Sequence, residues 1–499
     1  LETSGSTVVM EGGHPSGLFE ESYCPPHLVS DRFNYVGKLP GQGKTKGTST
    51  LIPAPTARHI KLAQMNPKLP AKLDDEDGSV RHARMVKICG PTRPFAPFIA
   101  DNTWQAIGEN TDRVLRKHKA SLRILTEHQV LNGDPSIGVK PMDLSKSVGV
   151  SYPVRMADGF KFVAPPPGFK KIDAVEGEPG SYKLLPLWRE AFDWLRSQYK
   201  QKRIGKMTFK TCLKDELRHW TDEYMAETGV KQKQTRAFIS APFGHFFLSK
   251  EYEGSLASFQ MSTPFEDETA SGSDPHGPIF QLFVHKRQKK GTHGVETDVE
   301  SFQSTHDPDT FERETQYVNG RYRLFDPNWK QEDDDVRCML GLEALFAHFC
   351  IDAHVFQKFS GLTTGIFSTL SRNNARRKCL SRDLWQRIMI DSSLSSDVAK
   401  KLMGVSGFAR NVSLTTQGDD ADEVISSLGL QFYHGESMAK AAKEKGIGLT
   451  DGSKNALTRE AKPRDEMGFC SMIPLPDPEN RIPGCTHLPD MEKAGIRKS

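Results

Sequence analysis

The sequence over residues 412–425 is Val412-Ser413-Leu414-Thr415-Thr416-Gln417-Gly418-Asp419-Asp420-Ala421-Asp422-Glu423-Val424-Ile425. Residues 412–416 alternate as a β-strand does, and 421–425 form a second β-type run, so a hairpin is expected with Gly418-Asp419-Asp420 at its turn. Adjacent aspartates in a tight turn repel each other and bury nothing apolar. A divalent cation between the carboxylates would neutralise the pair. The triplet alone is a weak signal, because it also occurs in ordinary surface turns.

A second candidate acid lies upstream, at Asp298 in Gly294-Val295-Glu296-Thr297-Asp298-Val299-Glu300-Ser301-Phe302. Phosphoryl transfer with two metal ions needs carboxylates from separate elements to hold the ions about 3.5–4 Å apart. Asp298 and Asp419 together would supply these ligands, and they are our first candidates for a catalytic site.

Positive charge is concentrated in residues 199–236. This segment carries ten lysines and arginines against five acids, a net charge of +5 that exceeds the +4 of the whole chain. Such a segment suits a surface that binds phosphates. A solvated helical face explains the charge equally well.

The composition excludes several classes of protein. The chain has 499 residues, of which 36% are hydrophobic and 26% charged, with 41 glycines and 31 prolines, so it is not a collagen, a coiled coil or a largely disordered chain. No apolar run reaches the roughly 18 residues of a membrane span. The eight cysteines form no CxxC pair, which favours reduced thiols. Gly41-Gln42-Gly43-Lys44-Thr45 fails as a phosphate-binding loop because Lys38 occupies the first glycine position.

Two helices are expected from periodicity. Apolar residues recur at helical spacing between Leu184 and Leu195, with Pro186 near the start. Residues 336–356 form the longest apolar-periodic stretch and are expected to be a core helix. His348, Cys350 and His354 lie inside it, and their apolar neighbours favour a buried helix face over a zinc site.

Six segments, in family order around the Gly-Asp-Asp triplet, resemble RNA-dependent RNA polymerases of picornavirus-like positive-strand RNA viruses. Gly43-Lys44-Thr45-Lys46 and Leu131-Asn132-Gly133 with Pro141-Met142 also resemble this family, particularly its dicistrovirus-like members. The resemblance covers roughly residues 40–475. The segments are Ser147-Val148-Gly149; Lys214-Asp215-Glu216-Leu217-Arg218 with Thr235-Arg236; Asp298; Ser360-Gly361 with Thr363-Thr364-Gly365-Ile366-Phe367; Gly446-Ile447-Gly448-Leu449-Thr450-Asp451-Gly452-Ser453-Lys454; and Phe469-Cys470-Ser471.

The resemblance implies a role for each matching residue. Two Mg²⁺ (or Mn²⁺) ions would be held by Asp298 and Asp419, with Asp420 in support. Lys454 would be the general acid that protonates pyrophosphate. The remaining matches would bind the incoming triphosphate (Lys214, Arg218, Arg236), shape the nucleotide and template contacts (Ser360, Gly361, Thr364) and line the template entry (Ser147, Val148, Gly149).

Two residues depart from the family together. Gln303 stands where the family has a second aspartate, and Ser368 stands where it has an asparagine. In the family these side chains sense the ribose 2′-hydroxyl. Gln and Ser still donate and accept hydrogen bonds, so ribose recognition is expected either to persist in altered form or to be relaxed. The turn after Asp420 is expected to hold the extra polar residues 421–423.

The implied fold is α+β, a right-hand polymerase with fingers and palm and with the thumb largely missing. Only 28 residues follow the Phe469-Cys470-Ser471 segment, and the prolines among them argue against the long helices of a thumb. Together with the absent initiator methionine, this leads us to expect a partial sequence. The expected parts are an extended N-terminal segment (1–60), fingers (61–290), palm (291–324), a fingers insertion (325–358), palm (359–471) and a truncated thumb or tail (472–499).

The expected function is that of a viral RNA-directed RNA polymerase that binds RNA template, RNA product and nucleoside triphosphates. The resemblance also implies other viral replication proteins as partners and the host cytoplasm, at membrane-associated replication complexes, as the location. Three alternatives stay open: a polymerase-like RNA-binding protein without elongation activity, a structural or capsid-associated RNA-binding protein, and a reverse transcriptase.

Overall fold

The computed structural model describes residues 22–39, 68–70, 77–89, 100–205, 207–214, 217–219, 236–273, 283, 286–287, 289–452, 455–467, 472–474 and 487–489. Lys454 and the segment 469–471 lie outside the described residues, and so does most of the C-terminal tail. The general acid, the role of the segment at 469–471 and the truncated thumb therefore stay predictions.

The central feature is an antiparallel sheet with strand order β13-β14-β10-β15. Its strands are β13 (Val412–Gln417), β14 (Asp420–Ile425), β10 (His293–Val299) and β15 (Leu449–Thr450), and β16 (Lys462–Pro463) pairs with the start of β10. The predicted hairpin is confirmed, because β13 pairs with β14 from Val412↔Ile425 to Gln417↔Asp420. One expectation is wrong: residues 421–423 do not extend the turn but continue β14 as buried strand residues.

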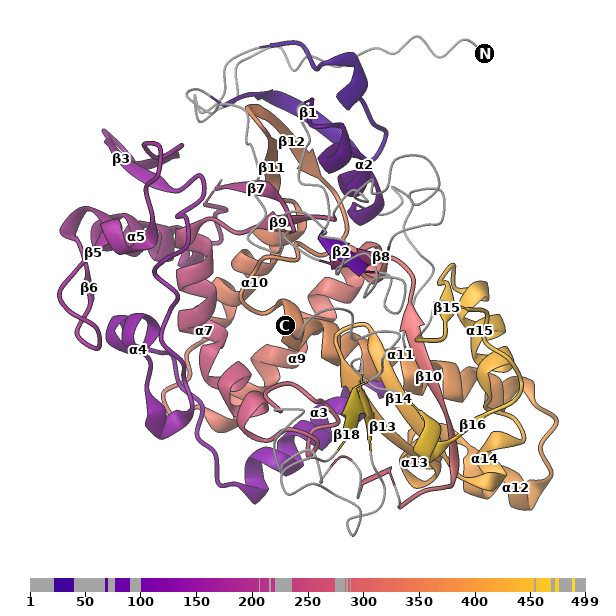
Figure 1. Ribbon diagram of the computed structural model, residues 1–499. Helices are drawn as coiled ribbons and strands as arrows, with labels where there is room; N and C mark the ends of the chain where they lie inside the picture. Colours follow the sequence, from indigo (N-terminus) through magenta and orange to yellow (C-terminus); the bar gives the residue numbers. More distant parts are fainter. Residues whose placement is uncertain are drawn as a thin grey trace.

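Helices cover one face of this sheet (Figure 1). The longest is α11 (Thr369–Asp391), which packs against β13 and against α13 (Gly404–Asn411), α15 (Gly435–Glu444), α3 (Asp101–Lys117) and α9 (Pro308–Phe325). Aromatic and aliphatic side chains fill the space between sheet and helices, among them Trp385, Phe408, Leu414, Ile425 and Tyr433. This apolar core fixes where α11 lies behind the strands.

A second sheet has the order β1-β12-β11-β7-β9. It consists of β1 (Phe33–Lys38), β12 (His354–Lys358), β11 (His348–Ile351), β7 (Thr208–Leu213) and β9 (Ala237–Ser240), and only its β11–β7 pair is parallel. Helix α2 (Ser79–Ile88) shares a core with this sheet through Met85 and Ile88. The sheet thus joins three parts of the chain that are far apart in sequence, at residues 33–38, 208–240 and 348–358.

The predicted helix over residues 336–356 is wrong beyond residue 345. Helix α10 (Gln331–Leu345) ends there, and β11 and β12 follow as a hairpin whose turn includes Asp352 at φ +50°. Both faces of this hairpin are largely buried, so its apolar residues run on continuously instead of alternating, and such a run resembles a buried helix. His348, Cys350 and His354 are therefore strand residues.

The helix predicted between Leu184 and Leu195 is confirmed as α5 (Pro186–Lys200). Its proline occupies the first turn, where a missing amide hydrogen costs nothing. Trp188, Phe192 and Leu195 bury its apolar face against α7 (Phe243–Ser262).

The other elements are short or peripheral. They are α4 (Glu127–Asn132), α12 (Ser396–Leu402), α14 (Ser427–Leu430), β2 (Lys68–Pro70), β3 (Tyr152–Met156), β4 (Gly159–Val163), β5 (Val175–Glu176), β6 (Lys183–Leu184), β8 (Leu217–His219), β17 (Met472–Pro474), β18 (His487–Pro489) and the 3₁₀ turns η1 (Pro26–Leu28), η2 (Pro135–Ile137), η3 (Lys171–Ala174), η4 (Phe302–Thr305) and η5 (Arg464–Glu466). Within the described ranges, no helix is both long and apolar enough to cross a bilayer. The domain boundaries stay predictions.

Candidate active site

The hairpin turn at residues 417–420, here called the aspartate turn, presents Asp419 at the edge of the central sheet. Gln417 and Asp420 form the last strand pair, so Gly418 and Asp419 alone make the turn. Gly418 has φ +69°, a left-handed conformation that glycine adopts without strain. Asp419 and Asp420 are both half-buried. The sequence therefore forms a tight turn with two carboxylates at its tip.

Strand β10 carries Asp298 to the same end of the sheet. Thr297 pairs with Ala421, so one step further along β10 brings Asp298 level with Asp420. On its other side Asp298 pairs with Thr450 of β15. Its side chain is 3% exposed. The structure thus places Asp298 and the aspartate turn on adjoining strands, at the same end of the sheet.

Further buried acids lie beside Asp298, and they were not predicted from the sequence as part of the site. Asp422 forms an ion pair with Arg287 at 2.9 Å, and Glu296 lies opposite Asp422 in the β10–β14 pair. Burial raises the pKa of Asp422 to about 6, Arg287 opposes this rise, and Glu296 adds to it. The alternation of β14 places residues 420 and 422 on one face. This alternation is the feature of the sequence from which Asp422 could have been assigned to the site.

The carboxylates at this end of the sheet are the candidates for a metal site. In the described part of the chain, no group of three or more histidine, cysteine, aspartate or glutamate side chains is arranged to hold a metal ion. The donors that Asp298, Asp419 and Asp420 offer are carboxylate oxygens alone, the ligands that Mg²⁺ and Mn²⁺ prefer. The donor atoms of these three residues therefore fit a hard divalent cation.

Lys214 and Arg236 lie beside strands of the second sheet, and their charges affect the pKa of Asp419. They flank β7 and β9, and the amide of Lys214 donates to the carbonyl of Arg236 at 2.8 Å. Burial raises the pKa of Asp419, whereas the charges of Arg236, Arg377 and Lys214 act to lower it. Two of the three predicted triphosphate-binding residues therefore lie near the aspartate turn. Arg218 lies in β8, paired with Leu69, and only its backbone is described.

The predicted nucleotide loop at Ser360-Gly361 is docked onto the turn that holds Gln303. The amide of Gly361 donates to the carbonyl of His306, and the amide of Leu362 donates to the carbonyl of Gln303, both at 2.8 Å. Because the bond to Leu362 uses the Gln303 backbone, the half-buried side chain of Gln303 is not needed for it. Gln303 and the nucleotide loop are thus brought together.

Buried groups beneath the nucleotide loop fix its path. The hydroxyl of Ser360 donates to the carbonyl of Cys89. The Lys358 ammonium donates to the carbonyl oxygens of Leu345, at 2.7 Å, and of Gly361. The Lys358 side chain is fully buried, and this burial lowers its pKa to about 7, a shift that Cys89 opposes. These contacts hold the loop from below.

Ser368 and Thr364 differ in their bonding. The Ser368 hydroxyl is buried and accepts a hydrogen bond from Nε of Arg372 at 3.1 Å. Arg372 in turn forms an ion pair with Glu253 at 2.9 Å. The hydroxyl oxygen of Thr364 is shielded from solvent and has no hydrogen-bond partner among the residues that the structure describes. Ser368 therefore supports the start of α11, and Thr364 has a polar atom available for a ligand.

The segment Ser147-Val148-Gly149 lies against the start of α7. The carbonyl of Val148 accepts from the amide of Phe243 at 2.8 Å, and the side chain of Val148 is buried in the core around Trp188. Ser147 is exposed, and its hydroxyl accepts from the amide of Gly149 at 3.1 Å. A template contact here would come from Ser147 or from the backbone.

Comparison with known proteins agrees with this arrangement. Residues 92–478 match the family model described as viral RNA-dependent RNA polymerase. Among solved structures, a Sicinivirus 3Dpol RNA-dependent RNA polymerase superposes with a TM-score of 0.63 at 16% sequence identity, over 92% of this chain and 84% of that chain. No curated protein matches significantly. The fold, the ordered motifs and the family match lead to one conclusion: the chain belongs to the viral RNA-dependent RNA polymerases and is an RNA-directed RNA polymerase.

Proposed function

We propose that this polymerase extends an RNA 3′-hydroxyl by template-directed nucleotidyl transfer with two divalent metal ions, in replication and transcription of a viral genome. The observation that carries the proposal is the placement of Asp298 and the aspartate turn on adjoining strands at one end of the central sheet. Asp298, Asp419 and Asp420 would hold the ions. When bound, two Mg²⁺ or Mn²⁺ ions activate the attacking hydroxyl and stabilise the leaving pyrophosphate.

The protein's own residues bind and orient the substrates. Lys214, Arg218 and Arg236 would pair with the triphosphate, and the position of Lys214 and Arg236 near Asp419 supports this for two of them. Lys454 would protonate the pyrophosphate, which requires a lysine pKa brought closer to neutral.

The nucleotide loop and the template entry complete the proposed substrate contacts. The loop at Ser360-Gly361, with Thr364, would position the nucleotide, and Gln303 and Ser368 would read the ribose. Ser147, Val148 and Gly149 would guide the template by side-chain and backbone contacts. We also propose, as the resemblance implies, that the enzyme acts with other viral replication proteins at membrane-associated complexes in the host cytoplasm.

The test is primer extension on an RNA template with Mg²⁺ or Mn²⁺, with ribonucleotides and deoxynucleotides in parallel. Asp419→Asn keeps the size of the side chain and removes its charge, so incorporation should fall by about 10³-fold or more. Asp397→Asn is the matched control because Asp397 is an exposed residue on α12. Full activity of Asp419→Asn would refute the proposal. RNA binding without incorporation by the unmodified chain would favour the RNA-binding alternative.

A further inference from the structure

Two side chains of α11 bind the backbone of the aspartate turn from behind. Oδ1 of Asn374 accepts a hydrogen bond from the amide of Gly418 at 2.8 Å, and Nε of Arg377 donates to the carbonyl of Asp419 at 3.2 Å. Asn374 and Arg377 are three residues apart and therefore lie on the same face of the helix. Both are buried. The turn is thus held by the helix as well as by its own two strands.

Arg377 also reaches the strand that carries Asp298. Its Nη2 donates to the hydroxyl of Thr297, the residue directly before Asp298. Successive side chains of a strand point to opposite faces, so Thr297 faces the helix and Asp298 faces away from it. Arg377 therefore bridges both aspartate-bearing segments and lies on the far side of the sheet from the Asp298 carboxylate.

Arg377 is itself fixed by a buried network. Its Nη2 lies 3.6 Å from Oε1 of Glu423, and its Nη1 donates to the hydroxyl of Ser381 at 2.7 Å. Glu423 also accepts from Ser381 at 2.7 Å and from Tyr433 at 2.9 Å. Arg377, Ser381, Glu423 and Tyr433 are all 0% exposed. A buried polar network whose members are bonded in this way is rigid.

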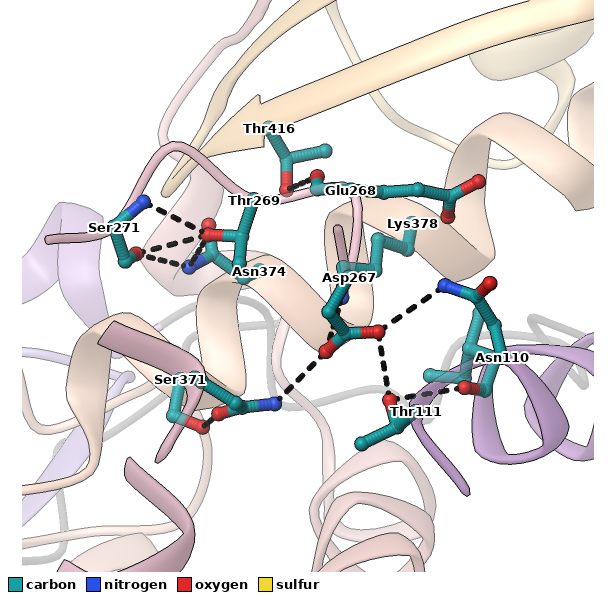
Figure 2. A network of polar contacts seen from close by, with 12 residues as sticks. Asn110, Thr111, Asp267, Glu268, Thr269, Ser271, Ser371, Asn374, Lys378 and Thr416 are labelled. Atoms are coloured by element: carbon teal, nitrogen blue, oxygen red, sulfur yellow. Dashed lines mark hydrogen bonds and ion pairs between the residues drawn. The ribbon is translucent and has the colours of Figure 1, made fainter. Parts of the chain in front are cut away.

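Asn374 is fixed from the other side by the loop at residues 267–271 (Figure 2). Its Nδ2 donates to the hydroxyls of Thr269, at 2.9 Å, and Ser271, at 2.8 Å. The same loop is tied to the helices through Asp267, which accepts from Thr111 at 2.8 Å and pairs with Lys378 at 3.0 Å. The carboxamide orientation that presents Oδ1 to Gly418 is thus set by its neighbours.

From this geometry we propose that Arg377, assisted by Asn374, is a positioning residue that sets the placement of Asp419 relative to Asp298. The inference rests on the proposed function, in which these two aspartates act together. Catalytic carboxylates must be held within about 0.5 Å of their working geometry, and a misplacement of about 1 Å can cost a factor of about 100 in rate. A guanidinium joined to both segments supplies that constraint.

The experiment separates positioning from stability. Arg377→Met alone leaves Glu423 as a buried charge without its cation, so we expect it to lower the melting temperature. The double variant Arg377→Met/Glu423→Gln removes that charge. The glutamine oxygen can still accept from Tyr433, and its Nε2 can donate to the Ser381 hydroxyl, which no longer accepts from Arg377. We expect the double variant to melt near wild type but to have kcat about 100-fold lower, with KM for nucleotides and RNA affinity within about twofold.

Three further variants complete the test. Arg377→Lys keeps the charge but loses the guanidinium group that binds both Thr297 and the carbonyl of Asp419. We therefore expect kcat to fall about 10-fold with little change in melting temperature. Asn374→Ala should lower kcat, whereas its neighbour Asn373→Ala should not. Arg387→Met, on the exposed part of α11, controls for loss of an arginine from this helix.

The outcomes distinguish the two proposals. A double variant whose kcat recovers together with its melting temperature would show that Arg377 is only structural, and wild-type kcat in Arg377→Lys would show the same. Asp419→Asn is measured beside them. If it is inactive while the Arg377 variants are fully active, the proposed function stands and the positioning role falls; if it is fully active, both fall.

Discussion

A Cβ atom on Gly361 would lie 1.9 Å from the carbonyl oxygen of Ile88. The nucleotide loop therefore passes against the end of α2 with no room for a side chain. Gly361 also has φ +83°, which an L-residue adopts only at a cost.

Gly361→Ala should destabilise the protein by more than the roughly 1–2 kcal/mol of backbone strain alone, because the loop must also move off Ile88. Gly404→Ala is the matched control, since Gly404 has φ +70° and nothing within 4 Å of its added Cβ. Urea unfolding of both variants measures the difference. Equal losses would mean that the contact with Ile88 adds nothing.

Gln303→Leu should lower the preference for ribonucleotides over deoxynucleotides. The backbone bond from Leu362 to Gln303 survives the change, so the loop should stay in place while the polar side chain is lost. Loss of one hydrogen bond to the ribose corresponds to a change of about tenfold in the ratio of kcat/KM values. Single-nucleotide incorporation with both sugars gives the ratio, and an unchanged ratio would exclude Gln303 from ribose recognition.

Lys214→Ala should raise KM for nucleoside triphosphates about tenfold or more, because it removes a charge-assisted contact worth about 1.5 kcal/mol. Lys202→Ala is the control, since Lys202 is an exposed lysine of the same basic segment and lies 3.6 Å from Asp335. RNA affinity should be the same in both variants. A similar KM in both would mean that Lys214 does not bind the triphosphate.

Lys358 should make stability depend on pH. Its pKa is lowered to about 7 in the folded state and returns to its usual 10.5 on unfolding. Between these values the unfolded chain binds more protons, so this group's contribution to stability increases as pH rises from 7 towards 10. Relative to Lys358→Met, the wild type should therefore gain stability between pH 7 and pH 9 in urea unfolding. A constant difference across that range would contradict the lowered pKa.

The sequence was sufficient where local pattern and tertiary structure agree. The hairpin at 412–425 follows from its alternation and its glycine, and α5 follows from helical spacing and Pro186. The helix expected over 336–356 failed because β11 and β12 are buried on both faces and lose the alternation that marks a strand. Periodicity reports exposure, and it fails where a strand has no exposed face.

The site was predictable only in part, for a similar reason. Asp298 and Asp419 could be paired from motif order, but Arg287, Arg377 and Glu423 could not. Their importance comes from burial and from partners that are distant in sequence: Arg377 contacts residues 297 and 419, and Arg287 pairs with Asp422. A charged residue in a helix or a strand is most often solvent-exposed, so nothing in the local sequence distinguishes these from surface residues.

The buried ion pairs of α11 also constrain how this sequence can diverge. Lys378 pairs with Asp267 at 3.0 Å and Arg382 pairs with Glu268 at 2.7 Å. Replacing one partner alone leaves an uncompensated buried charge, at a cost of about 3–5 kcal/mol, whereas a joint change of both partners avoids that charge. Positions 267 and 378, and positions 268 and 382, should therefore change together between lineages, and these linked changes can anchor alignments of relatives too distant for motif comparison.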